Sequence, residues 1–372
     1  MFDMNCELNK FYRDHVRLNK EQRGKLAEYR ETNIARLKCG LDKLGYSHPS
    51  RIRNQGSFAM FTTNQHPNND YDIDVAIVFE KDDSPESPLD SRNRIESAMK
   101  EGGGNFSRPP EARTNAVTVW YQEGHHVDLA VHRRYLDQVG LEVIEHAGVE
   151  WKPRDPMEIT NWFNNLVNEL SPSKTNGATV SDEQMRRIVQ LLKMFAKSRE
   201  SWKLPGGLII STLVAEVYLN ARDYHRDDVA LYNTLNSISN RLQLSTDVYN
   251  PVDGTQKLTY KDEYINQVER LKDQLEKAKE WLQPLFASSC TTEKAIKAWK
   301  QFFNHSYWSE LLDEIIENAK ARGEEIQKAA STSSLYITKN AQLSITKSTE
   351  RHLEVPYHRN FGDVEKHEKK KE

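Results

Sequence analysis

Residues 54–80 read NQGSFAMFTTNQHPNNDYDIDVAIVFE, and two carboxylates stand there at the start of an apolar run. Val75–Phe79 has the composition of a buried strand. Asp72 and Asp74 are two residues apart, so on a strand both side chains point to the same face. Two ionised carboxylates this close repel each other in a partly dry setting unless a cation lies between them. The pattern therefore predicts a site for a hard cation such as Mg²⁺ on this strand.

A glycine-serine pair before these aspartates and a third aspartate after them extend the pattern. Gly56 allows the backbone to approach phosphate oxygens closely, and Ser57 adds a hydroxyl donor. A helix expected to start at residues 58–61 would direct free N–H groups at the same oxygens. Asp128 lies among apolar residues in HHVDLAVH (125–132), which predicts a neighbouring strand. Three aspartates on adjacent strands would hold two Mg²⁺ ions, with Mn²⁺ as the alternative, and two such ions assist in-line nucleotidyl transfer.

The composition predicts a soluble globular protein. Of its 372 residues, 37% are hydrophobic and 29% are charged, which excludes a disordered chain. No apolar run approaches the roughly 20 residues of a membrane span, and the N-terminus lacks a signal-peptide core, so no membrane partner is expected. Cys6, Cys39 and Cys290 lie far apart, which argues for a reducing compartment and against a structural zinc site. We therefore expect a cytoplasmic protein, and the formal net charge of -3 argues against a general surface for nucleic acid.

The hydrophobic patterning predicts an α+β fold of two lobes. Residues 19–45 have the periodicity of a long helix, with Asn19 and Gln22 as a capping box and Gly45 at the end. We expect a catalytic lobe with a mixed β-sheet and the long N-terminal helix at 1–150, a helical lobe at 151–330 and a polar tail at 331–372. The expected strands are 51–54, 72–80, 116–122 and 126–132; the later expected helices are 92–100, 155–170, 181–198, 208–222, 229–243, 260–283, 291–304 and 309–329; and 101–111 is expected to be a loop.

The GS…DxD…D pattern of this chain resembles the polymerase-β-like nucleotidyltransferase superfamily. Within it, Gln55-Gly56-Ser57 and the helical half resemble the bacterial relatives of cyclic GMP-AMP synthase, the CD-NTases, which make cyclic oligonucleotide second messengers in anti-phage defence. The resemblance extends over roughly residues 20–330. It is carried in the helical half by WKPRDPMEITNWFN (151–164), RRIVQLLKMFAKSR (186–199), LPGGLIISTLVAE (204–216) and RDDVALYNTL (226–235).

The resemblance implies a role for each matching residue. Asp72 and Asp74 would bind the metals that hold the triphosphate, and Asp128 would complete the second metal site and help to activate the incoming hydroxyl. Ser57 and the backbone of Gly56 would hold the β- and γ-phosphates. Three positions have open alternatives. Lys193 and Ser211 would close the pocket from the helical lobe, with Lys197 and Thr212 as their rivals, and Gln55 would approach a base or ribose or serve only in the turn.

The resemblance also implies the reaction. The chain would condense NTPs, ATP among them, into a cyclic di- or trinucleotide, release pyrophosphate, and signal to regulatory or effector proteins of a defence operon. A linear transferase acting on RNA, protein or a small molecule shares the same core motif. A catalytically silent nucleotide-binding scaffold is a further alternative, against which the three intact acids argue. The absence of a zinc insertion argues against direct activation by double-stranded DNA, although a basic strip leaves that possibility open and can equally bind triphosphate. The strip comprises Arg186, Arg187, Lys193, Lys197 and Arg199.

Three other features of the sequence are not expected to form part of the site. Asp70 extends the acidic run but is expected at the loop edge. His125 and His126 are adjacent, so on a strand they point to opposite faces and do not share an ion. The glycines at 102–104 lack the Lys-Ser/Thr ending of a P-loop.

Overall fold

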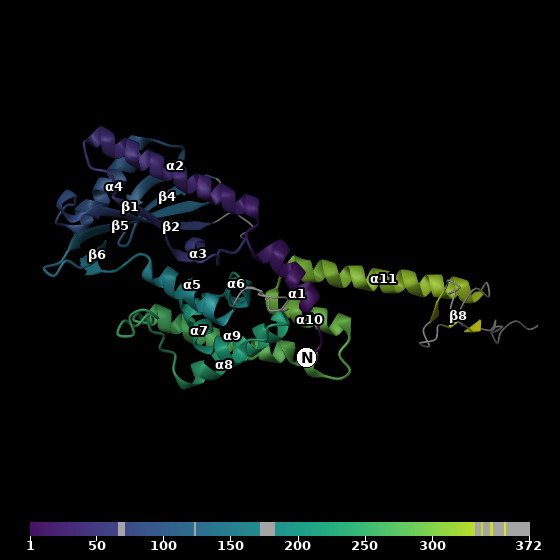
Figure 1. Cartoon of the computed structure of the whole chain (residues 1–372). Helices are drawn as coiled ribbons and strands as arrows, with labels where there is room; N and C mark the ends of the chain where they lie inside the picture. Colours follow the sequence, from purple (N-terminus) through teal and green to yellow (C-terminus); the bar gives the residue numbers. More distant parts are fainter. Residues whose placement is uncertain are drawn as a thin grey trace, which may run out of the picture.

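The structure is a computed structural model, and it describes residues 1–65, 71–122, 124–171, 183–331, 336–337, 343–344 and 353–354. Asp70 and most of the expected tail at 331–372 lie outside the described residues. The expected α+β class is confirmed: a mixed sheet lobe with a long N-terminal helix sits beside a helical lobe (Figure 1).

The main sheet places the acidic strand β2 between β1 and β5. Its order is β1-β2-β5-β4-β3, and β6 extends it by pairing with both β5 and β7. β2 and β5 run parallel, whereas the other neighbouring strands are antiparallel. The strands are β1 (Arg51–Asn54), β2 (Asp72–Glu80), β3 (Phe106–Ala112), β4 (Val117–Tyr121), β5 (His126–Leu136), β6 (Glu142–Ala147) and β7 (Trp151–Pro153).

The expectation of a loop at 101–111 is wrong, because most of that segment is strand β3. It carries Pro109 and Pro110, which cannot donate hydrogen bonds to a neighbour. β3 is an end strand of the order β1-β2-β5-β4-β3, and its pairing with β4 shifts register on both sides of Arg108. An edge position with irregular pairing tolerates prolines. Because prolines and glycines are more common in loops, the composition of this segment indicated a loop.

Two helices cover one face of the sheet and leave the other to the aspartates. α2 (Lys20–Leu44) has the expected capping box at Asn19, and Gly45 ends it with a φ of 71°. α2 and α4 (Pro88–Gly102) pack against the buried alternate residues of β2, from Ile73 to Phe79. Asp72 and Asp74 therefore face away from these helices, toward the helical lobe.

The helical lobe has its own hydrophobic cluster, which also takes in the start of the chain. Buried side chains between Met4 and Val16 pack with those of the later helices. This N-terminal element was not predicted from the sequence. The remaining elements are α1 (Asn5–Phe11), the π-helix η1 (Tyr12–Val16), α3 (Gly56–Ala59), η2 (Lys81–Asp83), α5 (Glu158–Leu170), α6 (Gln184–Ala196), α7 (Gly207–Ala221), α8 (Asp227–Leu244), α9 (Asp262–Leu282), η3 (Gln283–Phe286), α10 (Thr292–Phe303), α11 (Ser306–Ser331), β8 (Tyr336–Ile337), β9 (Leu343–Ser344) and β10 (Leu353–Glu354).

The two hydrophobic clusters support a proposed division into a sheet lobe at 1–150, a helical lobe at 151–330 and a tail at 331–372. The segment Met4–Val16 crosses this division, because its buried side chains belong to the helical cluster. α11 projects away from the body of the protein (Figure 1). Among the described helices, none combines the length and apolar character needed to cross a membrane.

Candidate active site

A cavity of about 840 Å³ lies between the two lobes. The sheet lobe contributes the turn before α3 and the start of β2, and the helical lobe contributes α6 and the start of α7. The cavity brings together residues far apart in the sequence. The predicted site residues in its wall are Gln55, Gly56, Ser57, Asp72, Asp74, Lys193 and Ser211.

The third aspartate stands beside the first two on the neighbouring strand, although it is not part of the cavity wall. In the parallel pairing of β2 with β5, Asp74 is aligned with Asp128 and Asp72 with His126. Residues paired in this way, and residues two apart on one strand, share a face. The structure therefore sets three carboxylates and one imidazole in a square of neighbouring positions.

The electrostatics of this square favour a bound cation. Burial, followed by the charges of Asp72 and Asp128, raises the pKa of Asp74 to about 7. Asp72, His126 and Asp128 can each direct one ligand atom so that these atoms lie within 4.8 Å of one another. Oδ1 of Asp128 is buried and has no hydrogen-bond partner among the described residues. These residues fit a divalent metal ion, which would supply the positive charge that the cluster lacks.

Gly56 is required where it stands, for two independent reasons. Its φ of +57° lies in the left-handed region, which side chains rarely adopt. A Cβ atom there would also come within 1.8 Å of Oδ2 of Asp74. The Asp74 carboxylate thus packs directly against the Gly56 backbone, and no larger residue fits between them.

The neighbours of Gly56 are held by hydrogen bonds within the protein. The hydroxyls of Ser57 and Thr63 are 3.0 Å apart and hydrogen-bonded. The backbone N–H of Gln55 donates to the carbonyl of Asp74, at 2.9 Å, and its side-chain amide donates to the carbonyl of Pro156, at 3.1 Å. These bonds favour the turn role for Gln55, whose side chain also lines the cavity.

The helical lobe places a cation opposite the carboxylates. Nζ of Lys193 donates to the carbonyl of Thr62, at 2.7 Å. Burial, followed by the charge of Lys197, lowers the pKa of Lys193 to about 8. Lys197 also lines the cavity but is exposed, so Lys193 is the more firmly positioned of the two lysines.

Of the two rival hydroxyls on α7, Ser211 lines the cavity. Thr212 is not part of that wall, and its hydroxyl donates to the carbonyl of Leu208 in its own helix, at 3.0 Å. The structure therefore favours Ser211 over Thr212.

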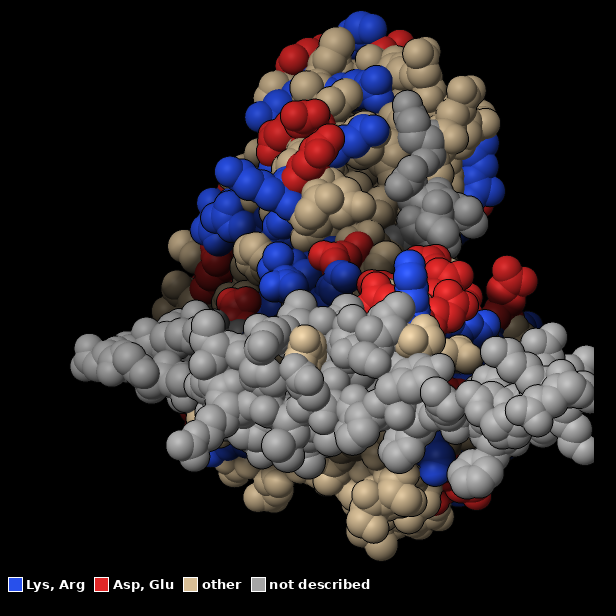
Figure 2. Space-filling view, turned by 90° about the vertical axis from the view of Figure 1, so that its right-hand side faces the viewer, with Lys and Arg blue, Asp and Glu red and all other residues tan. Residues whose placement is uncertain are grey.

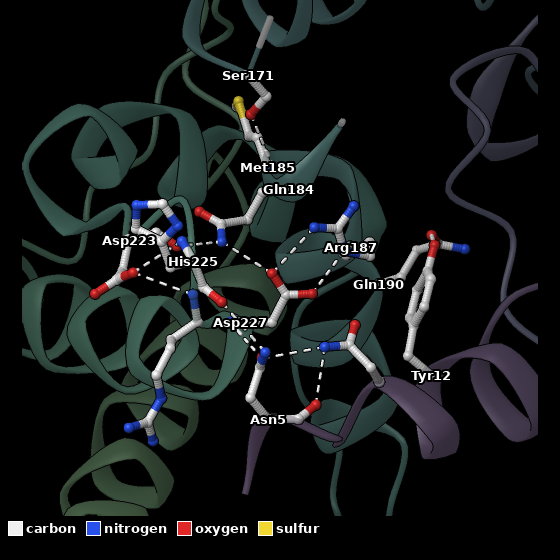
Figure 3. Close-up of polar contacts among 12 residues, drawn as sticks. Asn5, Tyr12, Ser171, Gln184, Met185, Arg187, Gln190, Asp223, His225 and Asp227 are labelled. Atoms are coloured by element: carbon white, nitrogen blue, oxygen red, sulfur yellow. Dashed lines mark hydrogen bonds and ion pairs between the residues drawn. The ribbon is translucent and has the colours of Figure 1, made fainter. Parts of the chain in front are cut away.

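The basic strip is interrupted, because its three arginines bind other parts of the protein. Arg187 pairs with the buried carboxylate of Asp227, at 2.6 Å, within the polar network that joins α6 to α8 and α1 (Figure 3). The guanidinium of Arg186 donates to the carbonyl of Met60. Arg199 donates to the carbonyl of Phe302, at 3.3 Å. On the described part of the face in Figure 2, the two signs of charge are interspersed.

The two adjacent histidines face opposite sides of the sheet, as expected. The ring of His125 is buried and stacks on Tyr29 of α2, with 3.6 Å between ring centroids. Nε2 of His126 instead lies 3.5 Å from Oδ1 of Asp72. His126 was not among the predicted site residues, although its two-residue spacing to Asp128 is sufficient to place both on one strand face.

Comparisons with known proteins give a family match for part of the chain and a fold match for most of it. Residues 50–132 match the family described as cyclic GMP-AMP synthase DncV-like, nucleotidyltransferase domain. CdnC of E. coli MS115-1, solved with ATP, is 16% identical with a TM-score of 0.60, and the match covers 82% of this chain and 98% of CdnC. The same CdnC was also solved in complex with HORMA-deltaN.

Two further solved structures have the same fold. CdnG of Bradyrhizobium diazoefficiens, solved with GTP, is 16% identical over 80% of this chain and 95% of its own, with a TM-score of 0.57. Vibrio cholerae DncV, solved with the linear intermediate pppA(3′,5′)pG, is 14% identical over 78% of this chain and 91% of its own, with a TM-score of 0.58. These likenesses establish the polymerase-β-like nucleotidyltransferase fold, and the matched residues include all three aspartates. Residues 50–132 are thus similar to the cyclic GMP-AMP synthase DncV-like family of nucleotidyltransferases, and the chain as a whole shares the fold of these solved structures.

Proposed function

We propose that this protein is a divalent-metal-dependent nucleotidyltransferase that joins NTPs into a cyclic di- or trinucleotide and releases pyrophosphate. The product would act as a second messenger in anti-phage signalling of the CBASS type. The observation that carries the proposal is one cavity between two lobes that is lined by Asp72, Asp74, a glycine-serine turn and the half-buried Lys193, with Asp128 paired to Asp74 on the neighbouring strand.

The residues would divide the work between two ends of the cavity. The Gly56 backbone and the Ser57 hydroxyl would donate to the triphosphate of the donor nucleotide, with Lys193 and Ser211 opposite them. Asp72 and Asp74 would hold a metal ion beside the triphosphate, and Asp128 would complete the second metal site and help to activate the attacking hydroxyl of the acceptor. The metal ions, two Mg²⁺ or Mn²⁺, would lower the pKa of that hydroxyl and neutralise the leaving pyrophosphate.

A protein partner is part of the proposal. CdnC, which shares the fold, was solved in complex with HORMA-deltaN. We therefore propose that regulatory or effector proteins of a defence operon act on or with this chain, whereas the arginines bound within the protein argue against a double-stranded DNA activator.

The test is to incubate the purified protein with all four NTPs and Mg²⁺ or Mn²⁺, treat the mixture with phosphatase, and analyse it by mass spectrometry. A phosphatase-resistant mass of two or three nucleoside monophosphates, less the water lost at each linkage, identifies a cyclase and names its bases. Phosphatase-sensitive linear chains would show a linear transferase. Nucleotide binding with no pyrophosphate release, in the presence of cell extract as a source of activators, would show a scaffold.

The matched variant is Asp72→Ala with Asp74→Ala. We expect it to abolish the product while it leaves the fold intact, because both carboxylates face the cavity rather than the core. Product formed at the wild-type rate by this variant would contradict the assignment of the site.

A further inference from the structure

His126 belongs to the same group of possible metal ligands as Asp72 and Asp128. It is aligned with Asp72 across β2 and β5, and it shares a strand face with Asp128. Its Nε2 lies 3.5 Å from Oδ1 of Asp72. One ligand atom from each of the three side chains lies within 4.8 Å of the other two, so a single ion can be shared between them.

A second observation points to a ligand at this place. Oδ1 of Asp128 is buried and accepts no hydrogen bond from any described residue. A carboxylate oxygen removed from water normally has a partner, because leaving it unpaired costs about 1–3 kcal/mol. An ion between Asp72, His126 and Asp128 would satisfy that oxygen.

The imidazole changes which ion the group prefers. Mg²⁺ selects oxygen ligands and gives up its water reluctantly. Imidazole nitrogen is a better ligand for transition metals, and affinity for nitrogen-containing sites rises along the first-row series from Mn²⁺. A site of two carboxylates and one imidazole therefore differs from a site of carboxylates alone in ion selectivity.

We propose that His126 is a ligand of the divalent ion held by Asp72 and Asp128, and that it makes this site select Mn²⁺ over Mg²⁺. The inference deepens the proposed function, since it concerns the cofactor of the same site. Ion binding requires no turnover, so the inference about His126 and the proposed function can be refuted separately.

The experiment measures Mn²⁺ binding to the full, metal-free protein without nucleotide. Free Mn²⁺ is followed by electron paramagnetic resonance during titration, and Mg²⁺ is then added as a competitor. Pulsed measurements on the bound Mn²⁺ report whether a ¹⁴N nucleus is directly coordinated. We expect ¹⁴N coupling in the wild-type protein and Mn²⁺ binding at least about 10-fold tighter than Mg²⁺ binding.

Three substitutions of one residue separate ligation from charge. His126→Ala should weaken Mn²⁺ binding by about 10-fold or more, with Mg²⁺ binding changed much less, and should remove the ¹⁴N coupling. His126→Gln offers an oxygen and should shift the preference toward Mg²⁺. His126→Arg keeps a positive partner for Asp72 but cannot coordinate, so it should lose Mn²⁺ as His126→Ala does.

The matched control is His48→Gln, which alters another histidine next to an aspartate. Nε2 of His48 lies 2.8 Å from Oδ1 of Asp42 on the surface, with no third ligand in any described metal-ligating group. This variant should bind both ions as the wild-type protein does.

The ¹⁴N coupling and the Mn²⁺ affinity together decide the inference. Absence of ¹⁴N coupling in the wild-type protein, undetectable Mn²⁺ binding, or full Mn²⁺ affinity in His126→Ala or His126→Arg would each overturn the inference. Retained ¹⁴N coupling in a protein that makes no nucleotide product would overturn the proposed function alone. A nucleotide product formed by a protein without ¹⁴N coupling would overturn the inference about His126 and leave the proposed function standing.

Discussion

Asp74→Asn should stabilise the metal-free protein at high pH, although it replaces a residue placed at the centre of the candidate site. The carboxylate is partly buried, packs against the Gly56 backbone, and lies beside two other carboxylates. Without a cation, ionising it is unfavourable, and this is why its pKa is raised to about 7. Asparagine has nearly the same shape but carries no charge.

The pH dependence follows from the direction of this shift. A carboxyl whose pKa is higher in the folded state than in the unfolded state favours folding while it is protonated in both states. That contribution is present below the unfolded pKa of about 3.8 and is lost as the pH rises through the folded value of about 7. The free energy of unfolding of the wild-type protein should therefore fall across this window, relative to that of Asp74→Asn.

The size of the effect has an upper bound. A shift of about three pKa units, at roughly 1.4 kcal/mol per unit, corresponds to about 4 kcal/mol. Because the repulsion is shared with Asp72 and Asp128, which relax when Asp74 changes, we expect a gain of about 1–2 kcal/mol at pH 8. The gain should vanish near pH 4.

Urea unfolding in the presence of EDTA, at pH 4, 6 and 8, measures this gain. The exposed Asp82 provides the control variant Asp82→Asn, which should not change the pH profile. Added Mn²⁺ should stabilise the wild-type protein more than Asp74→Asn. If Asp74→Asn is no more stable than the wild-type protein at pH 8 in EDTA, the carboxylates do not destabilise one another and the argument for a missing cation fails.

Gly56→Ala should remove nucleotide turnover, because the added methyl group overlaps the Asp74 carboxylate at 1.8 Å in a left-handed backbone; a pyrophosphate-release assay with wild-type activity would contradict this. Lys193→Ala should weaken ATP binding, measured by calorimetry, and wild-type binding should fall as the pH rises through about 8, whereas Lys193→Arg should bind independently of pH in this range. Gln190→Leu should lower the free energy of unfolding by about 1–3 kcal/mol, since the buried Gln190 side chain accepts from the Tyr12 hydroxyl and donates to the Thr63 carbonyl. The urea midpoint of Gln190→Leu is measured beside that of Tyr12→Phe. A midpoint of Gln190→Leu equal to that of the wild-type protein would show that these hydrogen bonds do not stabilise the fold.

Local patterns in the sequence were sufficient for the long helix, the acidic strand and the helical half. The capping box at Asn19 and the left-handed glycine at position 45 act within a few residues of the helix ends, and both are present as expected. The alternation along β2 likewise placed Asp72 and Asp74 on one face. These features depend on steric and hydrogen-bonding preferences of short segments, which is why they can be recognised without the rest of the chain.

Only the tertiary structure decided what those aspartates meet. The parallel pairing of β2 with β5 sets His126 beside Asp72, a contact between residues more than fifty positions apart. Packing between the lobes brings Lys193 to the cavity and turns Arg187 inward to Asp227. On the sequence these two cations look alike, because periodicity reports the face of a helix and not its neighbour. The sequence by itself determined the chemistry available to this protein, whereas the packing determined which charges share a site, since electrostatic interaction depends on distance and burial in the folded chain.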